Sequence, residues 1–167
     1  MYKKYLFLIS ILILLISCGT NKRDKNKLKH GIWITTKKTS EGEIKTKGRY
    51  KHGEAIGTWT TKINDTLSQK DKIKMVENDA IKKFYSYHIT SKTYYPNGKI
   101  YESGESMQTI DNADFNERHW FKFGPWKRFD KYGKVILIKY YKEGKLQSYF
   151  ENDSMHYDLR KFVDTDQ

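Results

Sequence analysis

The chain has few of the residues that cross-link or interrupt a small protein. Its 167 residues include one cysteine and two prolines. A single cysteine excludes an intramolecular disulfide, and hence a disulfide-stabilised scaffold. Hydrophobic residues make up 37% of the chain and charged residues 31%, which excludes a polytopic membrane protein and indicates one modest domain. Aromatic residues are abundant, since there are 13 Tyr, 8 Phe and 4 Trp. They favour a β-rich sheet with a thin aromatic layer.

Recognisable catalytic patterns are also lacking in the sequence. No nucleophile stands beside a base, and nothing supports serine or carboxylate catalysis. His88, His119 and His156 have no i, i+4 partner of the kind that a helix-borne zinc site uses. His30 and His52 belong to a repeated Lys-His-Gly triplet and are expected to be turn residues. We therefore expect a protein that is not an enzyme and that has no metal or cofactor.

Positive charge is in excess, with a formal net charge of +12. The lysines are spread singly along the chain, so they fit an ordinary solvated surface, although they also permit an anionic partner such as a lipid or glycan. No nucleic-acid partner is expected.

The first eighteen residues have the order of an export signal. Lys3 and Lys4 precede an apolar run from residue 6 to 16, and Leu-Ile-Ser-Cys-Gly follows at residues 15–19. A basic start, a short apolar segment and a small residue before the cleavage point are what a signal peptide requires. The segment resembles bacterial lipoprotein signals, which implies cleavage before Cys18 and lipidation of Cys18. An uncleaved N-terminal anchor is the alternative.

Residues 18–29 are polar and basic, so burial cannot order them and we expect a flexible tether. Its positive charges would favour anionic headgroups, or it is a plain soluble linker. Some lipoproteins carry an acidic export signal after the cysteine. This chain lacks one there, which favours a protein on the outer membrane that faces the periplasm over one displayed on the cell surface.

A repeat occupies most of the remaining chain. Gly-x-Ile-x-x-x-Gly occurs at residues 42–48 and again at 98–104, and a shortened Gly-x-Val occurs at 133–135. Gly-x-Trp occurs three times, ending at Trp33, Trp59 and Trp126, and Lys-His-Gly occurs at residues 29–31 and 51–53. Glycine beside a polar residue suits a tight turn, so each copy predicts a β-hairpin. Stacked hairpins bury one another's aromatic side chains.

Two segments carry a family resemblance. Tyr-Tyr-Pro-Asn-Gly-Lys-Ile at residues 94–100 and Lys-His-Gly-x-Trp at residues 29–33 resemble the bacterial variant of the MORN repeat, and the likeness covers residues 30–59 and 94–146. The resemblance implies an all-β, elongated array of antiparallel hairpins in a single sheet. In such an array the repeat tryptophans either pack the hairpins together or form an exposed aromatic row.

Two insertions interrupt the repeat. Residues 64–93 predict either a hairpin, with strands at 72–76 and 80–88, or a short helix over 79–87. Residues 106–116 predict a polar loop that is acidic and rich in aromatic residues. Its acids are too few for a calcium loop. For partner binding we select four residues in or beside it, namely Trp120, Asp111, Asp114 and Phe115.

The predicted domain layout follows from these features. A signal peptide at 1–17 and the tether at 18–29 precede a β-repeat domain at 30–150, and residues 151–167 form a C-terminal cap. In the cap, Met155, Leu159 and Phe162 have the i, i+4, i+7 spacing of a short amphipathic helix.

We therefore predict a membrane-anchored lipoprotein of the cell envelope that binds a protein partner or acts as a scaffold. Some MORN-variant proteins are grouped as antitoxin-like, so the resemblance also suggests an immunity protein that neutralises a toxin at the membrane. Binding of an anionic lipid or glycan is a further alternative.

Overall fold

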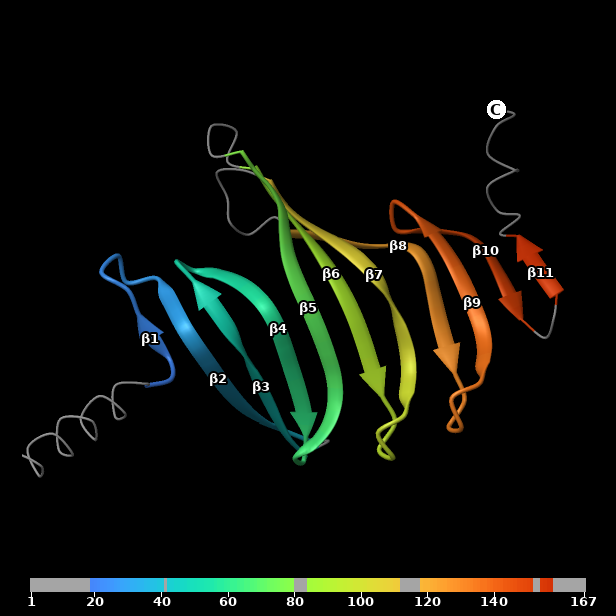
Figure 1. Cartoon of the computed structure of the whole chain (residues 1–167), viewed down its shortest axis with the longest axis horizontal. Helices are drawn as coiled ribbons and strands as arrows, with labels where there is room; N and C mark the ends of the chain where they lie inside the picture. Colours follow the sequence, from blue (N-terminus) through green and yellow to red (C-terminus); the bar gives the residue numbers. More distant parts are fainter. Residues whose placement is uncertain (1–18, 41, 80–83, 112–117, 152–153, 158–167) are drawn as a thin grey trace, which may run out of the picture.

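The structure is a computed structural model that describes residues 19–40, 42–79, 84–111, 118–151 and 154–157. This part of the chain forms one antiparallel sheet in which the spatial order of the strands is their order in the sequence. Figure 1 shows an elongated, twisted single layer with β1 at one end and β11 at the other. The strands are β1 (Lys22–Arg23), β2 (Lys29–Thr39), β3 (Gly42–Lys51), β4 (Glu54–Ile63), β5 (Thr66–Asp79), β6 (Phe84–Tyr94), β7 (Ile100–Asp111), β8 (Arg118–Phe129), β9 (Val135–Lys142), β10 (Lys145–Glu151) and β11 (Ser154–Tyr157). The all-β hairpin array is therefore confirmed.

The repeated Gly-x-Trp element forms a bulge in the sheet. Lys47 pairs with Thr60 and Arg49 pairs with Ile56, so Gly57, Thr58 and Trp59 together face the single residue Gly48. The same geometry recurs where residues 124–126 of β8 face Gly104 of β7. Gly57 and Gly124 begin these bulges with φ values of +68° and +63°, which glycine adopts at little cost.

Each of these bulges places a tryptophan ring over a glycine. A Cβ atom added to Gly48 would overlap the ring of Trp59, and one added to Gly104 would overlap the ring of Trp126. The last glycine of Gly-x-Ile-x-x-x-Gly and the tryptophan of Gly-x-Trp therefore depend on each other, because the glycine provides the space that the tryptophan ring of the next strand occupies.

The core is thin, as expected for a single layer. Among the described residues the buried hydrophobic side chains are Tyr87 and Trp126, each 6% exposed. In the first repeat Tyr50 lies edge-on to both Trp33 and Trp59, with ring centroids 5.8 and 5.0 Å apart. The repeat tryptophans thus pack strands together, as one of the two predicted roles required.

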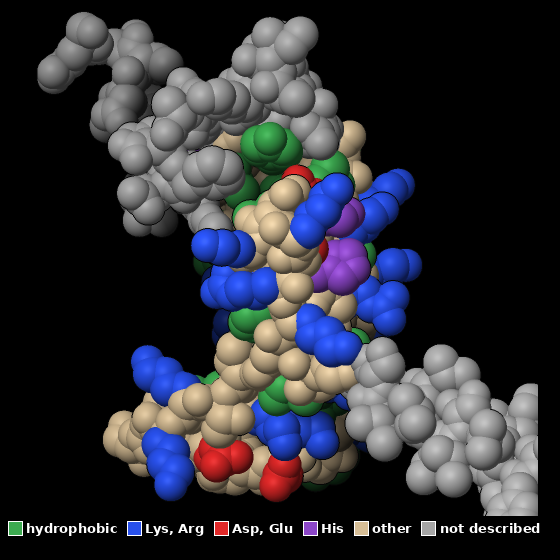
Figure 2. All heavy atoms as spheres, turned by 90° about the vertical axis from the view of Figure 1, so that its left-hand side faces the viewer, with side chains coloured by type: hydrophobic (Ala, Val, Ile, Leu, Met, Phe, Trp, Pro, Cys, Tyr) green, Lys and Arg blue, Asp and Glu red, His purple; other side chains and the backbone are tan. Residues whose placement is uncertain are grey.

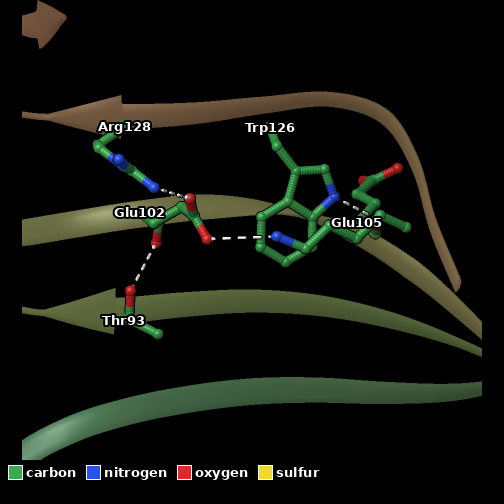
Figure 3. A network of polar contacts seen from close by, with 6 residues as sticks. Thr93, Glu102, Glu105, Trp126 and Arg128 are labelled. Carbon is green, nitrogen blue, oxygen red and sulfur yellow. Dashed lines mark hydrogen bonds and ion pairs between the residues drawn. The ribbon is translucent and has the colours of Figure 1, made fainter. Parts of the chain in front are cut away.

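A polar network supports Trp126 (Figure 3). Its Nε1 donates a hydrogen bond of 2.7 Å to the backbone oxygen of Glu105, and the ammonium group of Lys122 lies 3.7 Å from its ring centroid. The carboxylate of Glu102 pairs with Lys122 at 3.5 Å and with Arg128 at 3.4 Å. These contacts tie β7 to β8 on the face that carries Trp126.

The described parts of both insertions contribute to long strands of the same sheet. A hairpin within residues 64–93 is confirmed, as β5 and β6 pair from Gln69↔Thr93 to Asp79↔Phe84. Residues 77–79, which separate the two predicted strands, are nevertheless part of β5 and not a turn. The helix alternative over 79–87 is wrong for Asp79 and for residues 84–87, which are strand. The loop predicted at 106–116 is wrong for residues 106–111, which continue β7, and Ser106 is fully buried. The lengthened β6 offers β7 a hydrogen-bonding edge, and that edge extends the strand.

Both ends of the chain also differ from the predictions. Within the predicted tether, Lys22 and Arg23 form β1, and Asn21 accepts from the backbone N–H of Ile34 through its side-chain oxygen. Hydrogen bonds to β2 thus order a segment that has little apolar surface to bury. The predicted C-terminal helix is wrong for residues 154–157, which pair with β10 as β11. Leu159 and Phe162 lie outside the described residues. No helix in the described part is long and apolar enough to cross a membrane.

Candidate functional site

The structure describes the side chain of one of the four residues selected for partner binding. Trp120 lies in β8 and is 52% exposed. Asp111 is the last residue of β7, and its side chain is not among those described. Asp114, Phe115 and the predicted lipidation site Cys18 lie outside the described residues.

Trp120 ends a row of side chains that crosses four strands. Met75 pairs with Tyr87, Tyr87 with Gln108, and Gln108 with Trp120. Residues directly opposite in neighbouring strands share a face of the sheet, so these four side chains form a continuous row, which we call the Trp120 row. It begins with a half-buried methionine, passes through the buried Tyr87 and ends at the exposed indole.

The Trp120 row lies in a block of strands that extends past its neighbours. β4 pairs with β5 only as far as Ile73, and β9 pairs with β8 only from Gly124 onward. No described strand therefore pairs with the outer edge of residues 74–79 or of residues 118–121. In Figure 1 the ends of β5, β6 and β7 extend beyond that of β4.

The backbone of Trp120 faces the free edge of β8. The N–H of Gly144 donates to the carbonyl of Lys122 on the side away from β7, at 3.0 Å. Trp120 is two residues earlier in the strand, so its N–H and C=O point the same way. An exposed aromatic ring thus lies together with backbone groups that pair with no other described strand at this edge.

A second site lies near the β1 end of the sheet, where the two Lys-His-Gly triplets come together. The N–H of Gly53 donates to the carbonyl of Lys29 at 2.8 Å, and the rings of His30 and His52 lie 5.1 Å apart. His52 occupies the two-residue turn between β3 and β4, where both His52 and Gly53 have positive φ. Figure 2 shows histidine side chains exposed at this end among lysines and arginines.

Asp24 completes this second site. Its Oδ1 accepts from the backbone N–H groups of Asn26 and Leu28, and its Oδ2 lies 2.8 Å from Nδ1 of His52. The hydrogen bond with His52 lowers the pKa of Asp24, and the two backbone hydrogen bonds lower it further against the effect of burial. Asp24 is therefore held ionised. One ligand atom from each of Asp24, His30 and His52 lies within 4.8 Å of the others.

A basic groove lies beside this cluster. It has a volume of about 450 Å³ and is open to solvent, with Tyr50 and Ile56 among its apolar lining. Its cationic residues are Lys22, Arg49 and Lys51, and Gly19 also lines it. The groove thus brings positive charge to the residue that follows Cys18.

Sequence reasoning assigned His30 and His52 to turns, which is correct for His52 but wrong for His30, a residue of β2 that pairs with Lys22. It did not predict their association. The signal was present, because each stands at the same place in a Lys-His-Gly triplet. Equivalent positions of consecutive hairpins lie side by side when hairpins stack in sequence order. Asp24 carried no comparable signal, since it comes from the segment predicted to be a tether.

No protein-family model matches the chain, and no curated protein or solved structure matches it either.

Proposed function

We propose that this protein is a lipid-anchored protein of the bacterial cell envelope that binds a protein partner through its MORN-like sheet and has no catalytic role. The observation that carries the proposal is the free edge of β8 beside Trp120. Unpaired backbone groups at a sheet edge can accept a strand from another chain, while an exposed ring next to them adds buried area and selectivity. The anchor rests on the lipoprotein-like signal ending at Cys18.

The mode of binding we propose is addition of an extended segment of the partner to β8. The partner's backbone would pair with the outward N–H and C=O of Trp120, and its side chains would contact the indole. Trp120 is suited to this, since tryptophan is enriched among the residues that dominate binding energy at protein interfaces. A toxin acting at the membrane is one such partner, and immunity would then be the specific role.

The test is recovery of partners from solubilised membranes with the tagged full-length protein. Trp120→Ala removes the ring but keeps the edge N–H, and Trp120→Pro removes both. Proline is tolerated there because that N–H does not serve the β7 ladder. Tyr132→Ala is the matched control, since Tyr132 is 76% exposed in the turn between β8 and β9. We expect a protein recovered by the parent and by Tyr132→Ala, reduced with Trp120→Ala and absent with Trp120→Pro. Equal recovery by all four proteins would refute the edge mode.

A second candidate function is binding of an anionic headgroup or glycan in the basic groove. The supporting observation is that Lys22, Arg49 and Lys51 converge beside Gly19. Co-sedimentation with anionic vesicles should weaken with salt and with Arg49→Ala plus Lys51→Ala. Lys37→Ala plus Lys38→Ala removes the same charge from an exposed part of β2 and serves as control. The measurement is made in a Cys18→Ser background, which lacks the lipidation site. Equal loss of vesicle binding in both double variants would indicate nonspecific electrostatic attraction.

A further inference from the structure

We propose that Asp24, His30 and His52 bind a divalent transition-metal ion with a preference for imidazole ligands, represented by Zn²⁺. Two imidazole nitrogens and one carboxylate oxygen are a common set of three protein ligands for zinc, with water in the fourth position. The three groups come from three separate turns or strand ends that the stacking of hairpins brings together. This inference does not depend on the partner-binding proposal.

The distances suit such a site after small side-chain movements. Zinc bonds of about 2.0–2.2 Å place tetrahedral ligand atoms roughly 3.3 Å apart. Oδ2 of Asp24 and Nδ1 of His52 are already 2.8 Å apart, and the whole set lies within 4.8 Å. The side chain of His52 is 62% exposed and that of His30 is also exposed, so both rings can rotate to close the remaining gap.

The charge of the surroundings is compatible with a cation. The carboxylate group of Asp24 lies beside the two imidazole rings, with Oδ2 2.8 Å from Nδ1 of His52. Two of the nearby cations, Lys29 and Arg23, are directed elsewhere. Nζ of Lys29 lies 4.9 Å from the ring centroid of Trp33 and 4.8 Å from that of Tyr50. Arg23 donates through Nη1 to the carbonyl of Lys27 at 2.7 Å.

A bound ion would join the turn after β1 to the first two hairpins. Asp24 precedes β2, His30 lies at its start, and His52 lies in the turn between β3 and β4. An ion that binds the folded state alone raises the apparent stability of the protein, and the gain grows with the logarithm of the free ion concentration once that exceeds Kd. The site would thus fasten residues 22–30, the segment closest to Cys18, to the rest of the sheet.

The test is isothermal titration calorimetry of ZnCl₂ into the full-length chain in detergent micelles, without a histidine tag. The Cys18→Ser background is used because a free thiol binds zinc. We expect one site per chain, and affinity lowered at least about tenfold in His30→Ala, His52→Ala and Asp24→Asn. His119→Ala is the matched control, because His119 is also exposed but lies in β8. CaCl₂ should give no comparable heat, since calcium prefers oxygen ligands.

A second measurement guards against loss of folding in the variants. The thermal unfolding midpoint should rise with ZnCl₂ in the parent and in His119→Ala but not in His30→Ala. His30→Ala is decisive, since the ring of His30 makes no hydrogen bond among the described residues and its removal leaves the Asp24 turn intact. If His30→Ala binds zinc and is stabilised as the parent is, or if His119→Ala loses binding equally, the proposed site is wrong.

Discussion

The indole ring of Trp126 lies so close over Gly104 that the glycine cannot carry a Cβ atom without displacing the ring. Trp59 and Gly48 repeat this arrangement in the first copy. Neither Gly48 nor Gly104 has positive φ, so the requirement for glycine at these positions is one of space and not of backbone conformation.

Gly48→Ala and Gly104→Ala should therefore each lower the free energy of unfolding, by about 1–3 kcal/mol, as overpacking typically does. Urea denaturation measures this, and Lys47→Ala, in the exposed neighbouring position, is the control. In a double-mutant cycle, Trp59→Ala should abolish most of the cost of Gly48→Ala. Additive effects would show that the ring and the glycine are not in conflict.

The tryptophans of β8 should differ sharply in their contribution to stability. Trp126 is 6% exposed and hydrogen-bonded, so Trp126→Ala should cost about 3–5 kcal/mol. Trp120 is 52% exposed, so Trp120→Ala should cost roughly 1 kcal/mol or less. The comparison uses the same urea assay. Similar costs at the two positions would contradict the burial of Trp126.

The pKa of Tyr141 should report the charge of Glu102. Burial raises this pKa above its ordinary value, the Glu102 carboxylate raises it further, and Arg128 opposes both. Glu102→Gln removes the negative charge, so it should lower the pKa of Tyr141 while burial keeps it raised. Spectrophotometric titration of phenolate formation, taken as a difference against Tyr141→Phe in each background, isolates this group.

Glu43→Gln, on an exposed position of β3, should leave that pKa unchanged. An unchanged or raised pKa in Glu102→Gln would mean that the Glu102 charge does not act on Tyr141.

Asp130 should make part of the stability dependent on pH. Its Oδ1 accepts from the N–H groups of Tyr132, Gly133 and Lys134, at 2.9, 2.8 and 2.9 Å. The hydrogen bond from Lys134 contributes most to lowering the pKa of Asp130, the other two add to it, and burial opposes them. Since the folded pKa lies below the unfolded value of about 3.9, the contribution is present above that pH and is lost as pH falls through the folded pKa.

The urea midpoint of the parent should accordingly fall on acidification from pH 5 more steeply than that of Asp130→Asn, whose amide oxygen still accepts hydrogen bonds but does not titrate. Other carboxyl groups titrate in both proteins, so the difference between the curves isolates Asp130. Parallel curves of urea midpoint against pH for the two proteins would show that Asp130 does not contribute to the pH dependence of stability.

Cys18→Ser should abolish lipid attachment, because the sulfur atom is the acceptor in the proposed lipoprotein processing. Acyl chains stabilise membrane attachment by about 0.8 kcal/mol per buried methylene, so their loss removes most of the anchoring energy of a cleaved chain. Metabolic labelling with a radioactive fatty acid measures the modification. Ser10→Ala, within the apolar run, should retain the label. Label incorporated into Cys18→Ser would point to another attachment site.

The hairpin array could be predicted because its turns have a local signal in the sequence, a glycine beside a polar residue. The bulges at residues 57–59 and 124–126 were not predicted; each begins with a glycine of positive φ and ends with a tryptophan. The repeat elements at residues 29–33, 42–48 and 57–59 lie in β2, β3 and β4. The Lys-His-Gly turn at residues 51–53 could likewise be predicted from the sequence. In the structure it is a two-residue turn with positive φ at His52 and Gly53.

The errors arose where a neighbouring strand decides the structure. Ser106–Asp111 contains polar residues without a clear alternating pattern, and it is strand because β6 continues beside it. Met155 has helical spacing with Leu159 and Phe162, yet it pairs with Phe150 across β10 and β11. Strand pairing of this kind depends on a partner elsewhere in the chain, so local periodicity does not reveal it. The same holds for Asp24, because its contact with His52 requires that β1 pair with β2.

The strands have the same order in the sheet as in the chain, and this order affects how such a protein can evolve. In the described part of the chain each strand pairs with the strands next to it in sequence, and none of these strands closes the sheet. A hairpin can therefore be duplicated, lost or lengthened while the others keep their partners and register. The long strands β5–β8 are an example of such lengthening, and β8 has the free edge at which we propose that the partner binds. Evolution can thus remodel the recognition surface one hairpin at a time, without redesigning the scaffold that holds it.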